Sequence, residues 1–487
     1  MTDQREEPDK VPSLLERESR GGDVADGGLS FQESVMMSYV PTWLTHEGFE
    51  EMTRESMGDI EAKFFVPGRE SARELIEVKN HRILPAEFWE EVGRFRDLDD
   101  GSPDTFHRFV LVGKELGEDV KRLKNGLERV RGPHSFYEGT PIEETSFAGY
   151  AEMIVGMGHC EDDARFLFER VEIRDDLTTD EAQWRGVFTG ELFSHFPEYE
   201  ELPGKIVGDV YEGLGDLLRS RRNRSIPRKE VERRILGRVP VAIRPPVRPV
   251  VVRTSISDEK EEAGPEIRPI RLDWKDFSGG DGRSYPPPAE WDDRLIGELR
   301  QTKEWILRHR STRRVRLTGN RRHSAALAVG AVFSAVTGFA VEMEVRGGQL
   351  WATDAYPTEE TPNFPVSASG DVFACERLVV SVGVMRDISD AVEESLDALG
   401  LAGAPTLHLH SNEAVRSAEH ANKAAKVLKD TIVETLWRSG GARVELFFAG
   451  PAFLAMALGH GVNAVAPMRC HEWGSDGSYV PTCELPS

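Results

Sequence analysis

Three residues near the amino terminus have the types and spacing needed for phosphodiester hydrolysis: Asp59, Glu77 and Lys79. Glu77 and Lys79 flank Val78 in the segment IEVK, and residues two apart on a strand point to the same face. An Asp and a Glu side by side supply oxygen ligands for Mg²⁺, and an adjacent lysine can orient or deprotonate a water molecule. The pattern predicts a metal-dependent hydrolytic site that uses Mg²⁺, with Mn²⁺ as the alternative.

A Glu-x-Lys tripeptide alone is more often the solvated face of an amphipathic strand, so its neighbours decide between the two interpretations. Alternating residues predict one strand over 59–66, which Asp59 opens, and a second over 74–78. Glu61 shares the strand face of Asp59 and competes with it as a ligand. We assign the ligand role to Asp59 and a supporting role to Glu61.

Helices and a third strand are expected around these two strands. Apolar spacing predicts helices over 31–44 and 85–95, and a strand over 108–112. The expected order of elements is therefore α, β, β, α, β.

This order, with Gly27-Gly28 before the first helix, resembles the PD-(D/E)xK restriction-endonuclease-like fold. It is similar to the nuclease domain at the amino terminus of SAVED-containing effectors in CBASS antiphage systems. The resemblance implies a metal site formed by Asp59, Glu77, Lys79 and a Gln or Glu of the first helix. Gln32 and Glu33 are adjacent and cannot both face that site; Gln32 is the catalytic candidate, and the sequence leaves Glu33 open as the alternative.

The carboxyl-terminal part contains one pattern twice: a strand, a glycine turn, an apolar helix and another strand. The first copy begins at Val315 and turns at Gly319, and the second begins at Val444 and turns at Gly450. Parallel α/β units covered on both faces have this pattern. Two such units predict two Rossmann-like lobes around one cleft, where anions bind beyond the strand ends.

From about Leu272 onward the chain resembles the SAVED domain, most closely in the segment AGPAFLAMALG. The resemblance implies two fused CARF-like lobes that bind a cyclic oligonucleotide, and phosphates and bases need cationic, backbone N–H and flat aromatic partners. The expected phosphate contacts are Arg321, Arg322, His323 and Ser324 after the first glycine turn, Ser411 and Asn412 after the strand TLHLH, and Gly450 and Pro451. The expected stacking residues are Trp351 and Tyr479, although a Trp in this position is more often part of a core.

The net charge of −23 argues against general attraction to nucleic acid. Between Arg219 and Arg253, however, twelve Lys or Arg stand against only Glu230 and Glu232. This stretch is either a solvated face or a local DNA contact. A second basic stretch, from Arg308 to His323, has seven arginines and no acidic residue, and it adjoins the first glycine turn.

The chain has two long uncharged runs, at 324–341 and 447–468. Both contain glycines and end in strand-like residues, so we expect buried helix plus strand and no membrane span. The charged start MTDQREEPDK lacks a signal peptide, and four scattered cysteines show neither metal-ligand nor disulfide spacing. We expect a cytoplasmic protein.

The chain has 487 residues, which is more than a single hydrophobic core usually supports. We predict an α/β protein with a disordered tail at 1–26, a nuclease domain with a helical extension at 27–238, a Pro/Arg-rich linker at 239–271 and a SAVED sensor at 272–487.

The resemblance implies a DNA endonuclease of antiphage defence. A cyclic di- or trinucleotide activates it, homo-oligomerisation accompanies activation, and double-stranded DNA is cut to cause abortive infection. The alternatives are a non-catalytic, ligand-responsive DNA-binding regulator and a nucleotide-metabolising enzyme with its site in the carboxyl-terminal cleft.

Overall fold

The computed structural model describes residues 17–486, apart from 55, 70, 133–136, 138–139, 176–180, 222–223, 258–267, 281, 346, 359, 361 and 374. The chain forms two compact units. The amino-terminal unit comprises residues up to 45, 49–64 and 71–245, and the carboxyl-terminal unit comprises 46–48, 65–70 and the residues from 246 onward.

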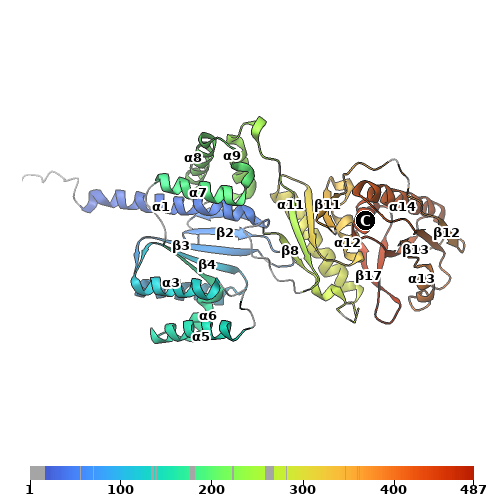
Figure 1. The fold of residues 1–487 in the computed structure, drawn as a ribbon, viewed down its shortest axis with the longest axis horizontal. Helices are drawn as coiled ribbons and strands as arrows, with labels where there is room; N and C mark the ends of the chain where they lie inside the picture. Colours follow the sequence, from blue (N-terminus) through green and yellow to red (C-terminus); the bar gives the residue numbers. More distant parts are fainter. Residues whose placement is uncertain are drawn as a thin grey trace, which may run out of the picture. The chain divides into compact units, whose positions relative to one another are not determined.

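The amino-terminal unit is built on one mixed sheet (Figure 1). Its elements are α1 (Arg17–Thr45), β1 (Phe49–Arg54), β2 (Ile60–Phe64), β3 (Ala72–Ile83), α2 (Pro85–Gly101), β4 (Phe106–Leu116), α3 (Glu118–Arg131), α5 (Pro141–Gly156), α6 (Glu161–Arg170), β5 (Val171–Arg174), α7 (Glu181–His195), α8 (Gly204–Ser220), β6 (Ile226–Pro227) and α9 (Arg228–Arg238). The strand order is β5-β4-β3-β2-β1-β6. β1, β2 and β3 are antiparallel neighbours, whereas β3, β4 and β5 run parallel.

Helices cover both faces of this sheet, as Figure 1 shows. Ile76 and Val78 of β3 pack in a core with α1, α7, α8 and α9. Leu75, from the opposite face of β3, packs in a second core with α2, α3, α5 and α6. The alternation of a β-strand therefore places Glu77 and Lys79 on the α2 side.

The predicted helices and strands around the catalytic candidates are present, and two expectations were wrong. Residues 17–26, expected in the disordered tail, belong to α1, while 1–16 lie outside the described residues. The sequence interpretation also missed β1, so the order is α, β, β, β, α, β. In β1 only Phe49, Met52 and Arg54 are buried, a pattern that does not alternate strictly and hides the strand in the sequence.

The carboxyl-terminal unit contains two sheets. Its main elements are β7 (Val250–Ser255), β8 (Ile270–Asp273), α11 (Gly297–His309), β9 (Arg314–Gly319), α12 (His323–Val332), β10 (Ala340–Val345), β11 (Gln349–Ala352), β12 (Val366–Ser369), β13 (Arg377–Val384), α13 (Ser389–Ser395), β14 (Thr406–Ser411), α14 (Ala418–Ser439), β15 (Arg443–Ala449), α15 (Ala452–Val462), β16 (Met468–Trp473) and β17 (Tyr479–Leu485). β7 lies within the expected linker, and that part of the linker assignment was wrong: Val250 and Val252 are fully buried and β7 pairs with β9.

The two sheets have the same plan. The first has the order β8-β7-β9-β10-β11, and the second has β14-β13-β15-β16-β17 with β12 added at the edge beside β14. In each sheet the first four strands are parallel and the fifth is antiparallel to the fourth. This repeat confirms the doubled α/β unit predicted from the sequence.

The helices of the two copies, α12 and α15, pack directly against each other. A Cβ added to Gly330 would lie 2.0 Å from the carbonyl oxygen of Met456, and one added to Gly459 would lie 2.1 Å from that of Leu327. The backbones can approach this closely only because both positions are glycine. The glycines that interrupted the two uncharged runs therefore mark the interface between the lobes.

Two short segments of the amino-terminal half belong to the carboxyl-terminal unit. Glu47 forms a buried ion pair with Arg310, and Phe65 stacks on Trp305 of α11 with ring centroids 5.2 Å apart.

Across the described residues, no helix is long and apolar enough to cross a membrane.

Candidate functional site

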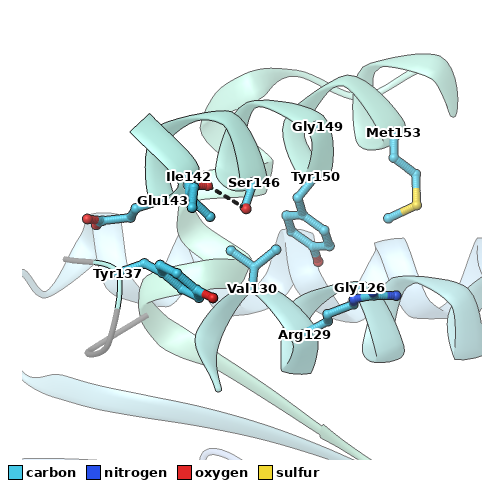
Figure 2. A pocket seen from close by; sticks show the side chains of 10 residues that line it. All are labelled: Gly126, Arg129, Val130, Tyr137, Ile142, Glu143, Ser146, Gly149, Tyr150 and Met153. Carbon is cyan, nitrogen blue, oxygen red and sulfur yellow. Dashed lines mark hydrogen bonds between the residues drawn. The ribbon is translucent and has the colours of Figure 1, made fainter. Parts of the chain in front are cut away.

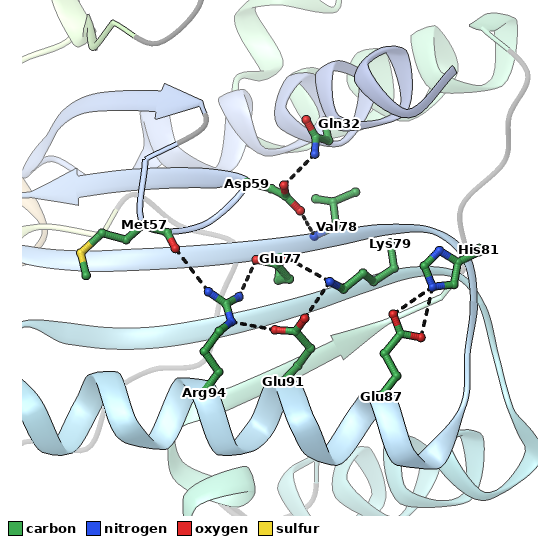
Figure 3. Close-up of polar contacts among 10 residues, drawn as sticks. All are labelled: Gln32, Met57, Asp59, Glu77, Val78, Lys79, His81, Glu87, Glu91 and Arg94. Atoms are coloured by element: carbon green, nitrogen blue, oxygen red, sulfur yellow. Dashed lines mark hydrogen bonds and ion pairs between the residues drawn. The ribbon is translucent and has the colours of Figure 1, made fainter. Parts of the chain in front are cut away.

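Asp59 lies just before β2 and is held from two sides (Figure 3). Its Oδ1 accepts a hydrogen bond of 2.7 Å from Gln32 Nε2 of α1, and its Oδ2 accepts one of 2.8 Å from the backbone N–H of Val78 in β3. The carboxylate is therefore fixed between the helix and the strand that carry the other predicted site residues.

Glu77 and Lys79 point to the same side of β3, as predicted, and contact each other. Lys79 Nζ lies 3.1 Å from Glu77 Oε1 and 2.7 Å from Glu91 Oε1 of α2. Arg94, one turn further along α2, donates to Glu77 Oε2 at 2.5 Å and to Glu91 Oε2 at 2.8 Å (Figure 3). The two carboxylates and two cations form a closed ring.

The electrostatic environment separates Asp59 from Lys79. Burial, together with repulsion from Glu77, raises the pKa of Asp59 to about 6. Burial alone would lower the pKa of Lys79, but hydrogen bonds and attraction from Glu91 and Glu77 outweigh it and raise that pKa. Lys79 is therefore protonated at neutral pH in this arrangement.

The structure distinguishes the neighbouring candidates that the sequence left open. Gln32 contacts Asp59, whereas Glu33, the next residue of α1, pairs with Arg54 of β1 at 2.7 Å. Glu61 is buried and accepts a hydrogen bond of 2.7 Å from the backbone N–H of Met57. Glu33 and Glu61 are thus engaged away from Asp59.

The residues present fit a divalent cation. Asp59 and Glu77 raise the local negative charge, and Gln32 Oε1 is buried beside Asp59 without a hydrogen-bond partner. An unpartnered buried amide oxygen next to a carboxylate is a ready ligand for a hard cation. Within the residues that the structure describes, no group of three or more His, Cys, Asp or Glu side chains is arranged as a metal site. The donor set is therefore two carboxylates supplemented by an amide oxygen.

Glu91 and Arg94 were missed by the sequence interpretation. Both lie on the side of α2 that faces β3, together with Glu87, which contacts His81 (Figure 3). Their spacing of three to four residues along a predicted helix is the signal that could have shown them.

A second candidate site lies in the carboxyl-terminal unit, in a cavity of about 930 Å³ lined by both glycine turns. Its lining residues are Gly319, Asn320, Arg321, Met343, Glu344, Val345, Gly347, Gly348, Gln349, Trp351, Val415, Gly450, Pro451, Ala452 and Phe453. Trp351 meets Phe453 edge-to-face, with centroids 5.5 Å apart. The cavity has the size of a ligand pocket and contains Arg321, Trp351, Gly450 and Pro451 from the predicted set.

Other arginines of the 308–323 stretch contact carboxylates or carbonyl oxygens of distant residues. Arg310 pairs with Glu47, Arg314 and Arg316 pair with Glu342, and Arg322 donates to the carbonyl oxygen of Ser278 at 2.7 Å. Arg321 Nη2 donates only to the nearby Gly319 carbonyl, and its Nη1 is buried without a hydrogen-bond partner. Burial lowers the pKa of Arg321 to about 10, so the group stays charged at neutral pH and lacks an anionic partner.

The remaining predicted ligand contacts lie outside this cavity. His323 contacts Phe448, and Ser324 is buried with its backbone N–H donated to Glu472 at 2.6 Å. A carboxylate therefore already occupies the start of α12. Ser411 is buried at the end of β14, Asn412 after it is exposed, and Tyr479 is buried against Phe447 and Trp473.

A smaller cavity of about 480 Å³ lies between α3 and α5 in the amino-terminal unit (Figure 2). Tyr150 reaches from α5 toward Gly126 of α3, and its hydroxyl is buried without a partner. Burial raises the pKa of Tyr150, so the phenol is neutral at physiological pH.

Comparison with known proteins identifies the carboxyl-terminal unit. Residues 298–485 match the SAVED family, the SMODS-associated and fused to various effectors sensor domain. This unit contains a SAVED domain.

Whole-chain similarity extends beyond the SAVED domain. Two relatives named CD-NTase-associated protein 4, from Moraxella osloensis and an Acinetobacter species, are each 26% identical over 97% of this chain and 99% of their own length. A solved structure of an Acinetobacter baumannii Cap4 SAVED/CARF-domain containing receptor with the cyclic trinucleotide 2'3'3'-cAAA matches with a TM-score of 0.82 at 23% identity. It covers 94% of this chain and 99% of that one. The likeness shows a shared fold.

Proposed function

We propose that this chain is a metal-dependent endonuclease for double-stranded DNA that a cyclic oligonucleotide activates through the SAVED domain. The observation that supports the nuclease most strongly is that Asp59, held by Gln32 and the Val78 N–H, lies close enough to Glu77 and Lys79 for their charges to shift its pKa. Its physiological role would be antiphage defence of the CBASS type, ending in abortive infection.

Asp59 and Glu77 would hold Mg²⁺ or Mn²⁺, with Gln32 Oε1 as a further oxygen donor. When bound, such a cation polarises the scissile phosphate and lowers the pKa of water. Protonated Lys79 would orient the attacking water or balance the charge that develops on the phosphate oxygens. The backbone N–H of Val78 keeps Asp59 in place through its hydrogen bond.

The messenger would bind in the cavity between the glycine turns, because this pocket supplies both chemical features of a nucleotide. Arg321 offers an unpartnered guanidinium N–H for a phosphate, and the N–H groups at the start of α15 adjoin it. Trp351 supplies an aromatic wall for a base. The size of the pocket and the ligand of the solved A. baumannii receptor favour a cyclic trinucleotide over a dinucleotide.

Activation requires that the messenger bind the active state better than the resting state. Homo-oligomerisation would provide such a state if ligand-bound protomers associate more tightly. We therefore expect the oligomer size to increase when the messenger is added, which light scattering would measure.

Plasmid cleavage tests the nuclease. The wild-type protein with Mg²⁺ and a cyclic adenosine trinucleotide should degrade double-stranded DNA, whereas Lys79→Ala should lose at least about 100-fold in rate, because a catalytic group is removed. Lys63→Ala is the matched control, since Lys63 pairs with Glu50 outside the site. Undiminished cleavage by Lys79→Ala would remove this active site. A wild type that binds ligand and DNA without cleavage would favour the non-catalytic regulator.

Thermal unfolding tests the sensor. The cyclic trinucleotide should raise the melting temperature of the wild-type protein, because a ligand that binds only the folded state stabilises it. Arg321→Gln should weaken binding by about ten-fold or more, since a charge-assisted hydrogen bond is lost. Arg313→Gln, whose parent side chain donates to the Thr337 carbonyl, is the control. Equal affinity of Arg321→Gln and wild type would place the phosphate elsewhere.

A further inference from the structure

Both carboxylate oxygens of Glu77 are engaged by cationic side chains. Lys79 contacts Oε1 at 3.1 Å and Arg94 contacts Oε2 at 2.5 Å (Figure 3). A divalent cation that binds Glu77 therefore competes with these two groups for the same carboxylate.

Glu91 offers the displaced groups a second acceptor. It already contacts Lys79 at 2.7 Å through Oε1 and Arg94 at 2.8 Å through Oε2. Lys79 is closer to Glu91 than to Glu77. Glu91 and Arg94 also lie three residues apart on α2, so their pairing needs no movement of the helix.

We propose that Glu91 is a positioning residue for Lys79 and that Arg94 is an internal counter-ion of Glu77, which the metal ion replaces. This inference rests on the proposed nuclease function and assigns two residues of α2 to its site. With a cation at Glu77, Glu91 keeps both Lys79 and Arg94 paired and holds the lysine ammonium beside the reacting phosphate.

Burial and charge balance support this exchange. The side chains of Glu77 and Glu91 are each 13% exposed. Leaving either of these largely buried carboxylates without a positive partner would cost free energy. Two carboxylates and two cationic groups are neutral together. Adding a divalent cation to Asp59 and Glu77 compensates the negative charge of Asp59, which has no cationic hydrogen-bond donor of its own among the contacts described above.

Cation binding without turnover tests the counter-ion role. The full-length protein without DNA is titrated with Ca²⁺ in a calorimeter. Arg94→Gln should bind Ca²⁺ about five-fold more tightly than the wild type, because the cation no longer competes with the guanidinium; five-fold corresponds to ~1 kcal/mol. Arg96→Gln is the matched control, since Arg96 lies on the same helix and pairs with Asp163.

Kinetics test the positioning role. Glu91→Gln should lower the rate constant for plasmid cleavage by about ten-fold or more while the KM for DNA stays unchanged, because Lys79 loses its second acceptor. Glu91→Asp should recover part of the rate, as it restores the carboxylate. Glu87→Gln is the control, because Glu87 contacts His81 and neither Lys79 nor Arg94. Melting temperatures of all variants exclude unfolding as the cause.

The outcomes separate this inference from the proposed function. Wild-type Ca²⁺ affinity in Arg94→Gln, or a wild-type rate in Glu91→Gln, overturns the inference while leaving the nuclease intact. A wild-type protein that neither binds Ca²⁺ nor cleaves DNA overturns the nuclease itself. Tighter Ca²⁺ binding by Arg94→Gln supports the counter-ion role even if the DNA substrate is different.

Discussion

The pKa of Asp59 reports the electrostatic environment of the candidate catalytic site. In the absence of metal, burial and the neighbouring Glu77 raise this pKa to about 6, so the folded protein protonates this carboxyl more readily than the unfolded chain does. Gln32 and the Val78 N–H fix its position but do not remove the repulsion. The ionised form of Asp59 is destabilised by repulsion from Glu77, and a bound cation would relieve this repulsion, which favours cation binding.

Asp59→Asn should therefore change the pH dependence of stability. Because the pKa of Asp59 is raised in the folded state, the contribution of this group to stability is greatest below about pH 4 and decreases as the pH rises through about 6. The shift corresponds to at most about 3 kcal/mol, and solvent screening of the partly exposed carboxylate reduces it. In EDTA, thermal unfolding of Asp59→Asn should lack this decrease between pH 4 and 7. Identical pH profiles of mutant and wild type would contradict it.

At the scale of secondary-structure elements, the close packing of two helices sets the geometry of the ligand pocket. α12 and α15 follow the two glycine turns that line the cavity, and they touch through Gly330 and Gly459. Gly319, with φ of +76°, also lies against Thr254, where a Cβ would come within 2.1 Å of the carbonyl oxygen. The pocket therefore depends on backbone approach as much as on its side chains.

Gly459→Ala should destabilise the carboxyl-terminal unit, because its Cβ would lie 2.1 Å from a backbone oxygen that cannot rotate away. Overpacking of this kind costs about 1–3 kcal/mol or more. Gly461→Ala on the same helix is the control: its Cβ would meet only Lys429 Cδ at 3.4 Å. The control should be neutral or stabilising by about 0.5–1 kcal/mol. Equal melting temperatures of the two variants would show that the helices can separate at little cost.

At the scale of the whole molecule, the boundary between the two units does not follow chain order. Residues 46–48, directly after α1, and 65–70, directly after β2, are built into the carboxyl-terminal unit. Gln32 lies on α1, and Asp59 immediately precedes β2. Both elements that hold the candidate catalytic carboxylate thus run without a linker into the unit that contains the SAVED domain.

A fragment of residues 246–487 should be markedly less stable than the same unit in the full chain. It lacks Glu47, the buried partner of Arg310, and Phe65, which stacks on Trp305. Removing one member of a buried ion pair costs about 3–5 kcal/mol. Arg310→Met should recover part of this loss in the fragment, because it removes the buried charge. Calorimetric unfolding of both fragments checks this, and equal stability of fragment and full chain would refute it.

The sequence alone determined the local elements and the chemistry of individual residues. Strand periodicity placed Glu77 and Lys79 on one face, and the doubled glycine pattern revealed the two lobes, because both are properties of a few consecutive residues. The same periodicity could not reveal β7, whose short strand lies in a stretch rich in proline and arginine. Its burial depends on pairing with β9, about sixty residues away.

Only the tertiary structure decided which candidate residues meet. It brought Gln32 and not Glu33 to Asp59, added Glu91 and Arg94 to the ring around Glu77, and left Nη1 of Arg321 buried without a hydrogen-bond partner. The physical reason is that charge pairing and burial depend on distances across the fold. Residue type fixes what a side chain can do, while the packed structure fixes which partner it has left to bind.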